Sequence, residues 1–247
     1  MKRKILIFFS GILTLFIVFV IAQITYIMTN GDPVPAPAID RSVRALGNGP
    51  KLTYVVMGDS TAISQGSEYE DGYAVSSSKH LAEKYSVSFS NVGISGATAG
   101  SVVAEQLVSA VQRKPDLVLL GVGANDTTHF TSGTSIKASL QKIIDSLRQA
   151  NPDVHIVVTR SPAMDSVTRF PWGAKQFMAL RTRQVNKAFA EIIETNNLTL
   201  APIAEKTRDA FIADPTLTAV DNFHPNARGY ALWKPVINDA IDRALAK

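Results

Sequence analysis

The stretch LTYVVMGDS, residues 52–60, joins a run of apolar residues to a short turn that ends in a serine. Similar apolar runs recur along the chain, and longer segments with the apolar spacing of a helix separate them. Near-continuous apolar runs such as LVLL, residues 117–120, are expected in a parallel sheet that is covered by helices on both faces. The pattern therefore predicts an α/β fold with a doubly wound, mostly parallel sheet of five strands between helices.

The expected strands share short apolar runs, and the expected helices share a helical period. We expect strands at residues 52–57, 87–92, 117–122, 154–159 and 198–203. We expect helices at residues 73–85, 99–113, 136–150, 175–196 and 226–246. In such sheets the ligand site lies beyond the carboxyl ends of the strands, so reactive residues should gather at that edge.

The N-terminus begins with a basic cluster, residues 2–4, that is followed by an uncharged stretch of 24 residues, 5–28. A helix of that length spans roughly 36 Å, which exceeds a hydrocarbon core of about 30 Å. We expect residues 1–28 to form a membrane anchor, with the basic end inside and the rest of the chain outside the cytoplasm. A cleaved signal sequence is the alternative and would make the protein secreted, but the A-x-A match at Ala36 and Ala38 lies well beyond the apolar stretch.

The next segment, residues 29–50, contains Pro33, Pro35 and Pro37 and few large apolar residues, which predicts an extended linker. A single folded domain is then expected at residues 51–247, since 46% hydrophobic and 19% charged residues suit one globular core. After Pro50 the chain has 20 Lys or Arg against 19 Asp or Glu, so nothing indicates a nucleic-acid partner.

Turns beside the expected sheet edge carry residues that suit acyl chemistry. Ser60 follows the first strand, and Gly96 lies in the turn after the second, where a backbone N–H can approach a ligand closely. Asn125 places an amide donor after the third strand. Asp221 and His224 stand three residues apart before the last helix, so one carboxylate can orient one imidazole. Turn and cap preferences explain each residue alone, and only their combination indicates a site.

Four blocks in this order resemble the SGNH/GDSL hydrolases, a family of serine esterases and lipases. They are Gly-Asp-Ser at residues 58–60, the glycine after the second strand, Gly-x-Asn-Asp at residues 123–126 and Asp-x-x-His-Pro at residues 221–225. The resemblance covers residues 51–247, and it departs from the family at Thr61, where leucine often follows the serine. The rival α/β-hydrolase fold needs a Gly-x-Ser-x-Gly elbow, which this sequence lacks.

The resemblance implies a catalytic triad in which Ser60 attacks the acyl carbonyl, His224 takes its proton and Asp221 orients the imidazole. It also implies an oxyanion hole made of the backbone N–H groups of Ser60 and Gly96 and the side-chain amide of Asn125. No cofactor is expected.

The expected function is that of a membrane-tethered, extracytoplasmic serine esterase that cleaves acyl or acetyl esters through an acyl-enzyme. An acyltransferase with the same site and a catalytically silent module that binds acyl groups or glycans are the alternatives. Small-molecule, lipid and glycan esters all suit the predicted chemistry, so the sequence leaves the natural substrate, the acyl-chain length and the oligomeric state open.

Other polar and aromatic residues carry weaker signals. The chain has no cysteine, and His80, His129 and His155 lack the spacing of metal ligands, so no metal site is expected. His129 follows the third strand and either contacts substrate or lies in a solvated loop. The acidic residues Glu68, Glu70 and Asp71 either border the entrance or form a solvated loop. The apolar segment containing Met164, Phe170, Trp172 and Phe177 forms either an acyl pocket or lid, or ordinary packing.

Overall fold

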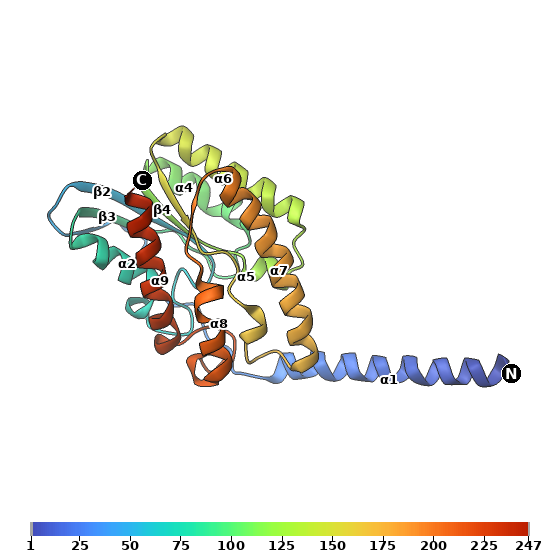
Figure 1. Cartoon of the computed structure of the whole chain (residues 1–247). Coiled ribbons are helices and arrows are strands. Elements are labelled where there is room, and N and C mark those ends of the chain that lie inside the picture. The colour runs from blue at the N-terminus through green and yellow to red at the C-terminus, as the bar shows by residue number, and fades with distance from the viewer. Residues whose placement is uncertain (1, 247) are drawn as a thin grey trace.

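The computed structural model describes residues 2–246, and Figure 1 shows an α/β domain from which one long helix projects. Met1, the first residue of the expected anchor, and Lys247, the last residue of the expected domain, lie outside the described residues. Within residues 2–246 the sheet has six strands, in the order β1-β3-β2-β4-β5-β6. The strands are β1 (Arg44–Leu46), β2 (Lys51–Gly58), β3 (Ser86–Asn91), β4 (Leu117–Gly121), β5 (His155–Val158) and β6 (Thr199–Leu200).

The five expected strands are present as β2 to β6, which run parallel to one another. The expected strand number is nevertheless wrong, because β1 adds an antiparallel edge strand that pairs with β3. This strand lies within the segment expected to be a linker. Its three residues, Arg44 to Leu46, carry no apolar run, and backbone hydrogen bonds to β3 define it, so periodicity alone does not reveal it.

The expected helices are all present, with bounds that shift by a few residues. The helical elements are α1 (Lys2–Thr29), α2 (Tyr73–Ala82), α3 (Ala99–Ser101), the π-helical turn η2 (Val102–Gln106), α4 (Leu107–Gln112), α5 (Ala124–Thr128), α6 (Gly133–Ala150), α7 (Trp172–Thr195), α8 (Ile203–Ala213) and α9 (Ala227–Leu245). The 3₁₀ turns are η1 (Tyr69–Asp71), η3 (Met164–Ser166) and η4 (Pro215–Leu217). Helices α5 and α8 were not among the expected elements.

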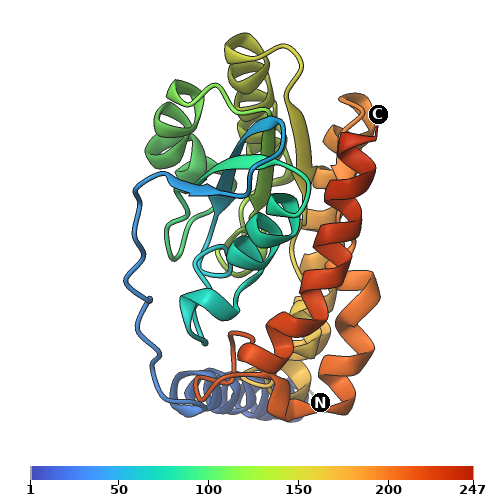
Figure 2. The ribbon, with the colours of Figure 1, turned by 90° about the vertical axis from the view of Figure 1, so that its left-hand side faces the viewer.

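Both faces of the sheet are buried, and alternate residues of each central strand serve opposite faces. Tyr54 and Val56 of β2 pack with α2, α8 and α9, whereas Val55 and Met57 pack with α4, α6 and α7. The helices thus form a layer on each side of the sheet (Figures 1 and 2). This double cover explains why β4, LVLLG, is apolar and buried at every position.

The N-terminal helix α1 projects from the domain, and its stretch from Phe9 to Thr29 has a mean hydropathy of 2.3. It is long and apolar enough to cross a membrane, although a signal sequence meets the same criterion. After α1, the chain runs along the outside of the domain to β1 (Figure 2). The segment is attached there, because Asp32 N donates to Val220 O at 3.0 Å and Gln65 Nε2 donates to Val34 O at 2.8 Å.

Candidate active site

The turn after β2 holds Ser60 at the carboxyl edge of the sheet. Asp59 N donates to Gly121 O at the end of β4, at 3.0 Å, which fixes the turn against the neighbouring strand. Gly58 has φ +153°, and a Cβ there would lie 2.1 Å from Gly121 O, so this position requires glycine. The buried side chain of Gln106, in the π-helical turn, accepts from Gly58 N at 2.9 Å and donates to Gly58 O at 2.8 Å.

Three residues that are distant in sequence form one chain of hydrogen bonds. Ser60 Oγ lies 2.9 Å from His224 Nε2, and His224 Nδ1 lies 2.6 Å from Asp221 Oδ2. Because an ionised carboxylate can only accept, the imidazole carries its proton on Nδ1 and leaves Nε2 free to accept from Ser60. This is the arrangement in which an imidazole can act as a base toward a serine hydroxyl.

The loop before α9 brings Asp221 and His224 together. Asn222, with φ +56°, occupies the left-handed region, which asparagine tolerates well, and the chain turns back so that Ala219 N donates to His224 O at 2.8 Å. Asp221 Oδ1 accepts from the backbone N–H groups of Phe223 and His224, at 2.9 and 3.0 Å. The carboxylate therefore orders its own loop as well as the imidazole.

Two buried carboxyl groups near Ser60 have shifted pKa values of opposite direction. Burial alone would raise the pKa of Asp221, but hydrogen bonds from the His224 imidazole and two backbone N–H groups outweigh it and hold the pKa below its ordinary value. Burial raises the pKa of Asp59 to about 6, against the weaker effect of hydrogen bonds from Thr61. Asp221 thus stays ionised at neutral pH, while Asp59 carries an electrostatic cost.

Two of the expected oxyanion residues, Gly96 and Asn125, lie in the loop after β3 and at the start of α5, and hydrogen bonds tie these two segments to each other. Asn125 Nδ2 donates to Ala97 O at 3.1 Å, and Asp126 Oδ2 accepts from Ala99 N at 3.0 Å. Gly96 lies between β3 and Ala97 in the sequence, is exposed and has φ +80°.

The loop that carries Gly96 is also tied to the serine turn. Ile94 N donates to Gly58 O at 3.0 Å, and Ser95 Oγ donates to Gln65 Oε1 at 2.6 Å. Gln65 N in turn donates to Ser60 O at 2.9 Å, so the loop and the turn form one network at the carboxyl edge of the sheet.

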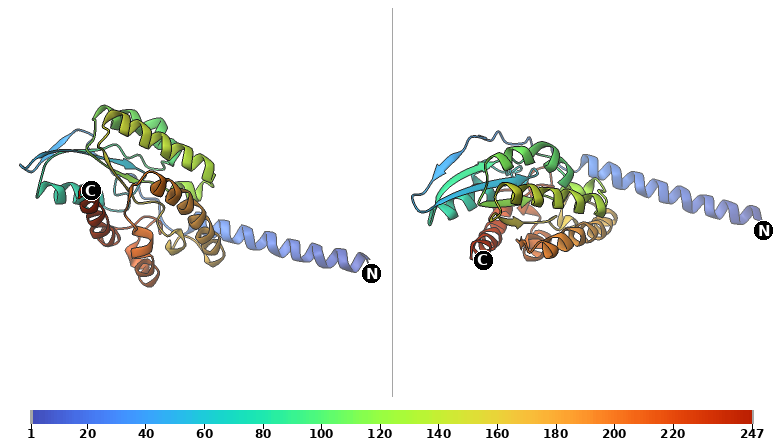
Figure 3. Two further views of the ribbon diagram at one scale, coloured as in Figure 1. Left: turned by 45° about the horizontal axis from the view of Figure 1, so that its top comes forward. Right: turned by 90° about the horizontal axis from the view of Figure 1, so that it is seen from above.

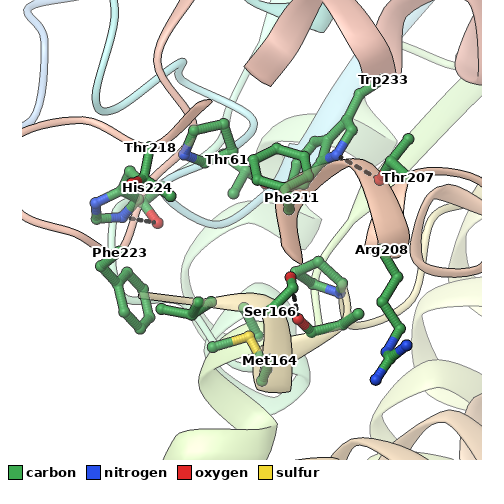
Figure 4. A pocket seen from close by; sticks show the side chains of 16 residues that line it. Thr61, Met164, Ser166, Thr207, Arg208, Phe211, Thr218, Phe223, His224 and Trp233 are labelled. Atoms are coloured by element: carbon green, nitrogen blue, oxygen red, sulfur yellow. Dashed lines mark hydrogen bonds between the residues drawn. The ribbon is translucent and has the colours of Figure 1, made fainter. Parts of the chain in front are cut away.

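A cavity opens beside Ser60 and His224, and most of its lining is apolar (Figure 4). His224 and Phe223 lie at one end, and Trp233, Thr207 and Phe211 lie at the other (Figure 4). Its volume is about 40 Å³, so it is a small cavity. The lining residues are Ser60, Thr61, Ala124, Pro162, Ala163, Met164, Ser166, Val167, Thr207, Arg208, Phe211, Thr218, Phe223, His224, Pro225 and Trp233.

Of the apolar residues singled out after the fourth expected strand, which is β5 in the structure, only Met164 lines this cavity. Phe170 is buried behind it and packs edge-on against Phe223, with ring centroids 6.2 Å apart. Trp172 and Phe177 are exposed on α7, and His129 is exposed after α5. The segment therefore divides into a cavity wall, a packing residue and an exposed surface.

The acidic residues after Ser60 do not line the cavity. Glu70 forms ion pairs with Arg44 of β1 and Lys79 of α2, at 2.9 and 3.0 Å. Within residues 2–246, no group of three or more His, Asp or Glu side chains is placed to hold a metal ion.

The far wall of the cavity and the support of the serine turn were not predicted from the sequence. Thr207 and Phe211 come from α8, and the spacing of Ile203, Thr207 and Phe211 by four residues is a helical signal that could have predicted this element. Gln106 gave no such signal, because a glutamine inside a helix is usually an exposed residue.

Comparison with known proteins places this fold among esterases and lipases. Similar solved structures include the psychrotrophic esterase EstA from Pseudoalteromonas sp., with a TM-score of 0.60 and 20% identity over 79% of this chain and 99% of that one. An extracellular lipase from Streptomyces rimosus has a TM-score of 0.59 and 18% identity, over 76% and 99%. A catalytic mutant of Axe2, an acetylxylan esterase from Geobacillus stearothermophilus, has 0.62 and 16%, over 79% and 96%.

At such identities these structures establish the fold, whereas a family model extends the comparison to the sequence. None of the curated proteins that were compared matches the chain. The model of the GDSL-like lipase/acylhydrolase family matches residues 56–232, from the end of β2 into α9. Because these residues make up well over half of the chain, the resemblance noted in the sequence is confirmed, and this protein belongs to the GDSL-like lipase/acylhydrolase family of carboxylic ester hydrolases.

Proposed function

We propose that this protein is a membrane-tethered serine esterase whose catalytic domain lies outside the cytoplasm, with Ser60, His224 and Asp221 as its catalytic triad. The observation that carries the proposal is the chain of hydrogen bonds from Ser60 through His224 to Asp221, at 2.9 and 2.6 Å. Such a chain activates a hydroxyl that is otherwise a weak nucleophile at neutral pH.

The reaction follows from this geometry. Ser60 Oγ attacks the ester carbonyl while His224 Nε2 takes its proton, and the Asp221 carboxylate stabilises the imidazolium. The imidazolium then protonates the leaving alcohol, and water hydrolyses the acyl-enzyme by the same route. The N–H groups of Ser60 and Gly96 and the amide of Asn125 are proposed to stabilise the oxyanion, and loss of one such donor costs about 2.7–4 kcal/mol.

The cavity favours a short acyl group as the natural substrate. With about 40 Å³ of space it accommodates an acetyl group more readily than a long chain, because each further methylene needs room that a packed interior lacks. The acetylxylan esterase among the similar structures makes an acetyl ester of a glycan a reasonable substrate class. Lipid and thioester substrates with short acyl groups share the same chemistry.

The tether is proposed from α1 and its basic start. The helix exposes its apolar side chains, including Leu15 and Phe16, to the surroundings, which a bilayer would cover. Lys2, Arg3 and Lys4 precede its apolar stretch, and a positive N-terminal flank favours the cytoplasmic side. The catalytic domain after α1 is then extracytoplasmic.

The test is hydrolysis of p-nitrophenyl acetate, butyrate and octanoate by the full chain in detergent, compared with Ser60→Ala. We expect turnover that falls with chain length and disappears in the variant. Ser42→Ala, an exposed serine before β1, is the matched control and should retain full activity. Loss of turnover in both proteins would contradict the hydrolase, and acyl transfer to an added alcohol in preference to water would indicate an acyltransferase.

A further inference from the structure

Large apolar side chains are exposed along α7, close to the place where the N-terminal helix α1 touches the domain. Trp172 is 76% exposed, Phe177 46% and Leu180 45%. Phe130, 57% exposed, comes from the loop before α6 and packs against Phe177, with ring centroids 5.7 Å apart. We call these four residues the α7 apolar face. Exposed aromatic residues that gather in this way usually mark a contact surface.

The same part of α7 is strongly basic. Residues 172–187 include Lys175, Arg181, Arg183 and Lys187 and contain no Asp or Glu. The guanidinium of Arg181 lies over the ring of Phe130, 5.7 Å from its centroid, so charge and apolar surface are interleaved. Basic residues combined with exposed Trp, Phe and Leu are typical of helices that lie in the interface of an anionic membrane.

The position of α1 relates this face to a bilayer. A Cβ built on Gly173 would lie 2.8 Å from the ring of Phe19 and 3.0 Å from Gln23 Oε1, so the start of α7 touches α1. Phe19 and Gln23 precede the end of α1 at Thr29 by ten and six residues, or about 15 and 9 Å along the helix axis. A hydrocarbon core of about 30 Å takes about 20 residues of a helix, so a span that begins at Ile5 ends near Ile24. The contact of Gly173 with Phe19 and Gln23 then places Trp172 close to the outer edge of the core, in the zone where tryptophan is enriched.

The arrangement of the helices agrees with this placement. In Figures 1 and 3, α7 borders the side of the domain from which α1 projects. A membrane lies across the axis of a helix that spans it, so it would extend along this side of the domain. The start of α7 is therefore among the parts of the domain that lie near the lipid.

We propose that the α7 apolar face rests on the outer leaflet of the membrane that α1 crosses, with the basic residues of α7 binding anionic headgroups. This inference rests on the proposed role of α1 as an anchor. Its consequence for the active site is positional: Met164 and Ser166 line the cavity only a few residues before α7 begins, so docking holds the cavity close to the lipid surface. The domain then acts on esters at the membrane surface instead of moving freely at the end of a long linker.

Tryptophan fluorescence of the full chain in nanodiscs tests the docking. The discs contain phosphatidylcholine and phosphatidylglycerol with acyl chains brominated near the headgroup. Of the two tryptophans, Trp233 is 3% exposed in the core and serves as a shielded reference. Trp172→Leu, at an exposed position, gives the Trp172 emission by subtraction. We expect brominated lipid to quench the Trp172 emission and to leave the Trp172→Leu protein unaffected.

A second reporter separates docking from anchoring. Ile17→Trp in the Trp172→Leu background places a reporter in the middle of α1, and bromine deeper in the acyl chains should quench it. Quenching at position 17 with an unquenched, iodide-accessible Trp172 would overturn the docking alone. An unquenched reporter at position 17 would overturn the anchor and the docking together, while ester hydrolysis in the same discs reports the proposed catalysis separately.

Charge reversal tests the choice of lipid. Arg183 and Lys187 are exposed, and the double variant Arg183→Glu and Lys187→Glu should lose Trp172 quenching in discs with phosphatidylglycerol. Quenching that is the same as in the unchanged protein would overturn the anionic-lipid assignment. A Trp172 that is shielded from both bromine and iodide would show that a protein surface, such as a second copy of the chain, covers the α7 apolar face instead.

Discussion

At the residue scale, the proposed triad requires Asp221 to hold the His224 ring in one tautomer. Its carboxylate accepts hydrogen bonds from the His224 ring and from two backbone N–H groups. Asp221→Asn keeps the size of the side chain but offers the ring a donor, which favours the wrong tautomer of His224. We expect kcat to fall by about 10⁴-fold, as in established Ser-His-Asp triads, with little change in KM. Steady-state kinetics would check this, and a variant with nearly normal kcat would rule out the assigned role.

Asp59 provides a prediction about stability and pH. Its pKa is about 6 in the fold against 3.8 as the ordinary value, so the folded state binds the proton more tightly than the unfolded state. The free energy of unfolding therefore falls as pH rises from about 4 to 6, by about 3 kcal/mol in total. Asp59→Asn removes this cost, so its Tm should exceed that of the unchanged protein near neutral pH and approach it at acidic pH.

Thermal unfolding across this pH range measures the difference. Asp153→Asn, an exposed carboxylate just before β5 at the opposite edge of the sheet, is the control and should show no such trend. An Asp59→Asn variant that is less stable near neutral pH would mean that the fold needs the ionised carboxylate to accept the hydrogen bonds from Thr61.

The wall of the cavity gives a prediction about specificity. Phe211 of α8 is 7% exposed and lines the cavity opposite His224. Phe211→Ala should enlarge the cavity and raise kcat/KM for octanoate relative to acetate esters, while Tm falls because a buried Phe→Ala change costs about 3–5 kcal/mol. Ile212→Ala, exposed on the same helix, is the control. An unchanged chain-length profile would place the acyl group elsewhere.

At the scale of elements, the segment between α1 and β2 behaves as part of the domain. Beyond the pairing of β1 with β3, Arg41 donates to Gly93 O at 3.0 Å, and Asp32 N donates to Val220 O beside the Asp221 loop. We expect a chain that starts at Lys51 to unfold at a lower temperature than one that starts at Gly31, since several hydrogen bonds worth about 0.5–1.5 kcal/mol each are lost. Equal Tm values for the two purified proteins would show that residues 31–50 are a passive linker.

At the scale of the whole molecule, α1 joins the catalytic loop as well as the domain surface. Asn30 accepts from Asn222 Nδ2 and donates to Thr168 O, both at 3.0 Å, and Arg169 Nε donates to Ile27 O at 3.0 Å. The end of the N-terminal helix, the segment before α7 and the loop of Asp221 thus form one polar cluster. A domain held in this way has a fixed orientation relative to α1, which is the condition that the proposed membrane docking requires.

The sequence by itself determined the layered fold, and it predicted the residues of the proposed site. Apolar runs such as residues 52–57 and 117–122 predict buried parallel strands, because a strand covered on both faces must be apolar throughout. The family motifs then predict Ser60, Gly96, Asn125, Asp221 and His224 as the site residues. These predictions rest on local patterns, and each pattern lies within one short stretch of the chain.

Only the tertiary structure decided the features that depend on contacts between distant segments. The edge strand β1 exists because β3 offers it a hydrogen-bonding partner, and the far wall of the cavity exists because α8 and α9 bring Phe211 and Trp233 together. Asn30 and Asn222 meet across 192 positions of sequence. No local sequence pattern predicts such long-range contacts, because they follow from how the elements pack once they have formed.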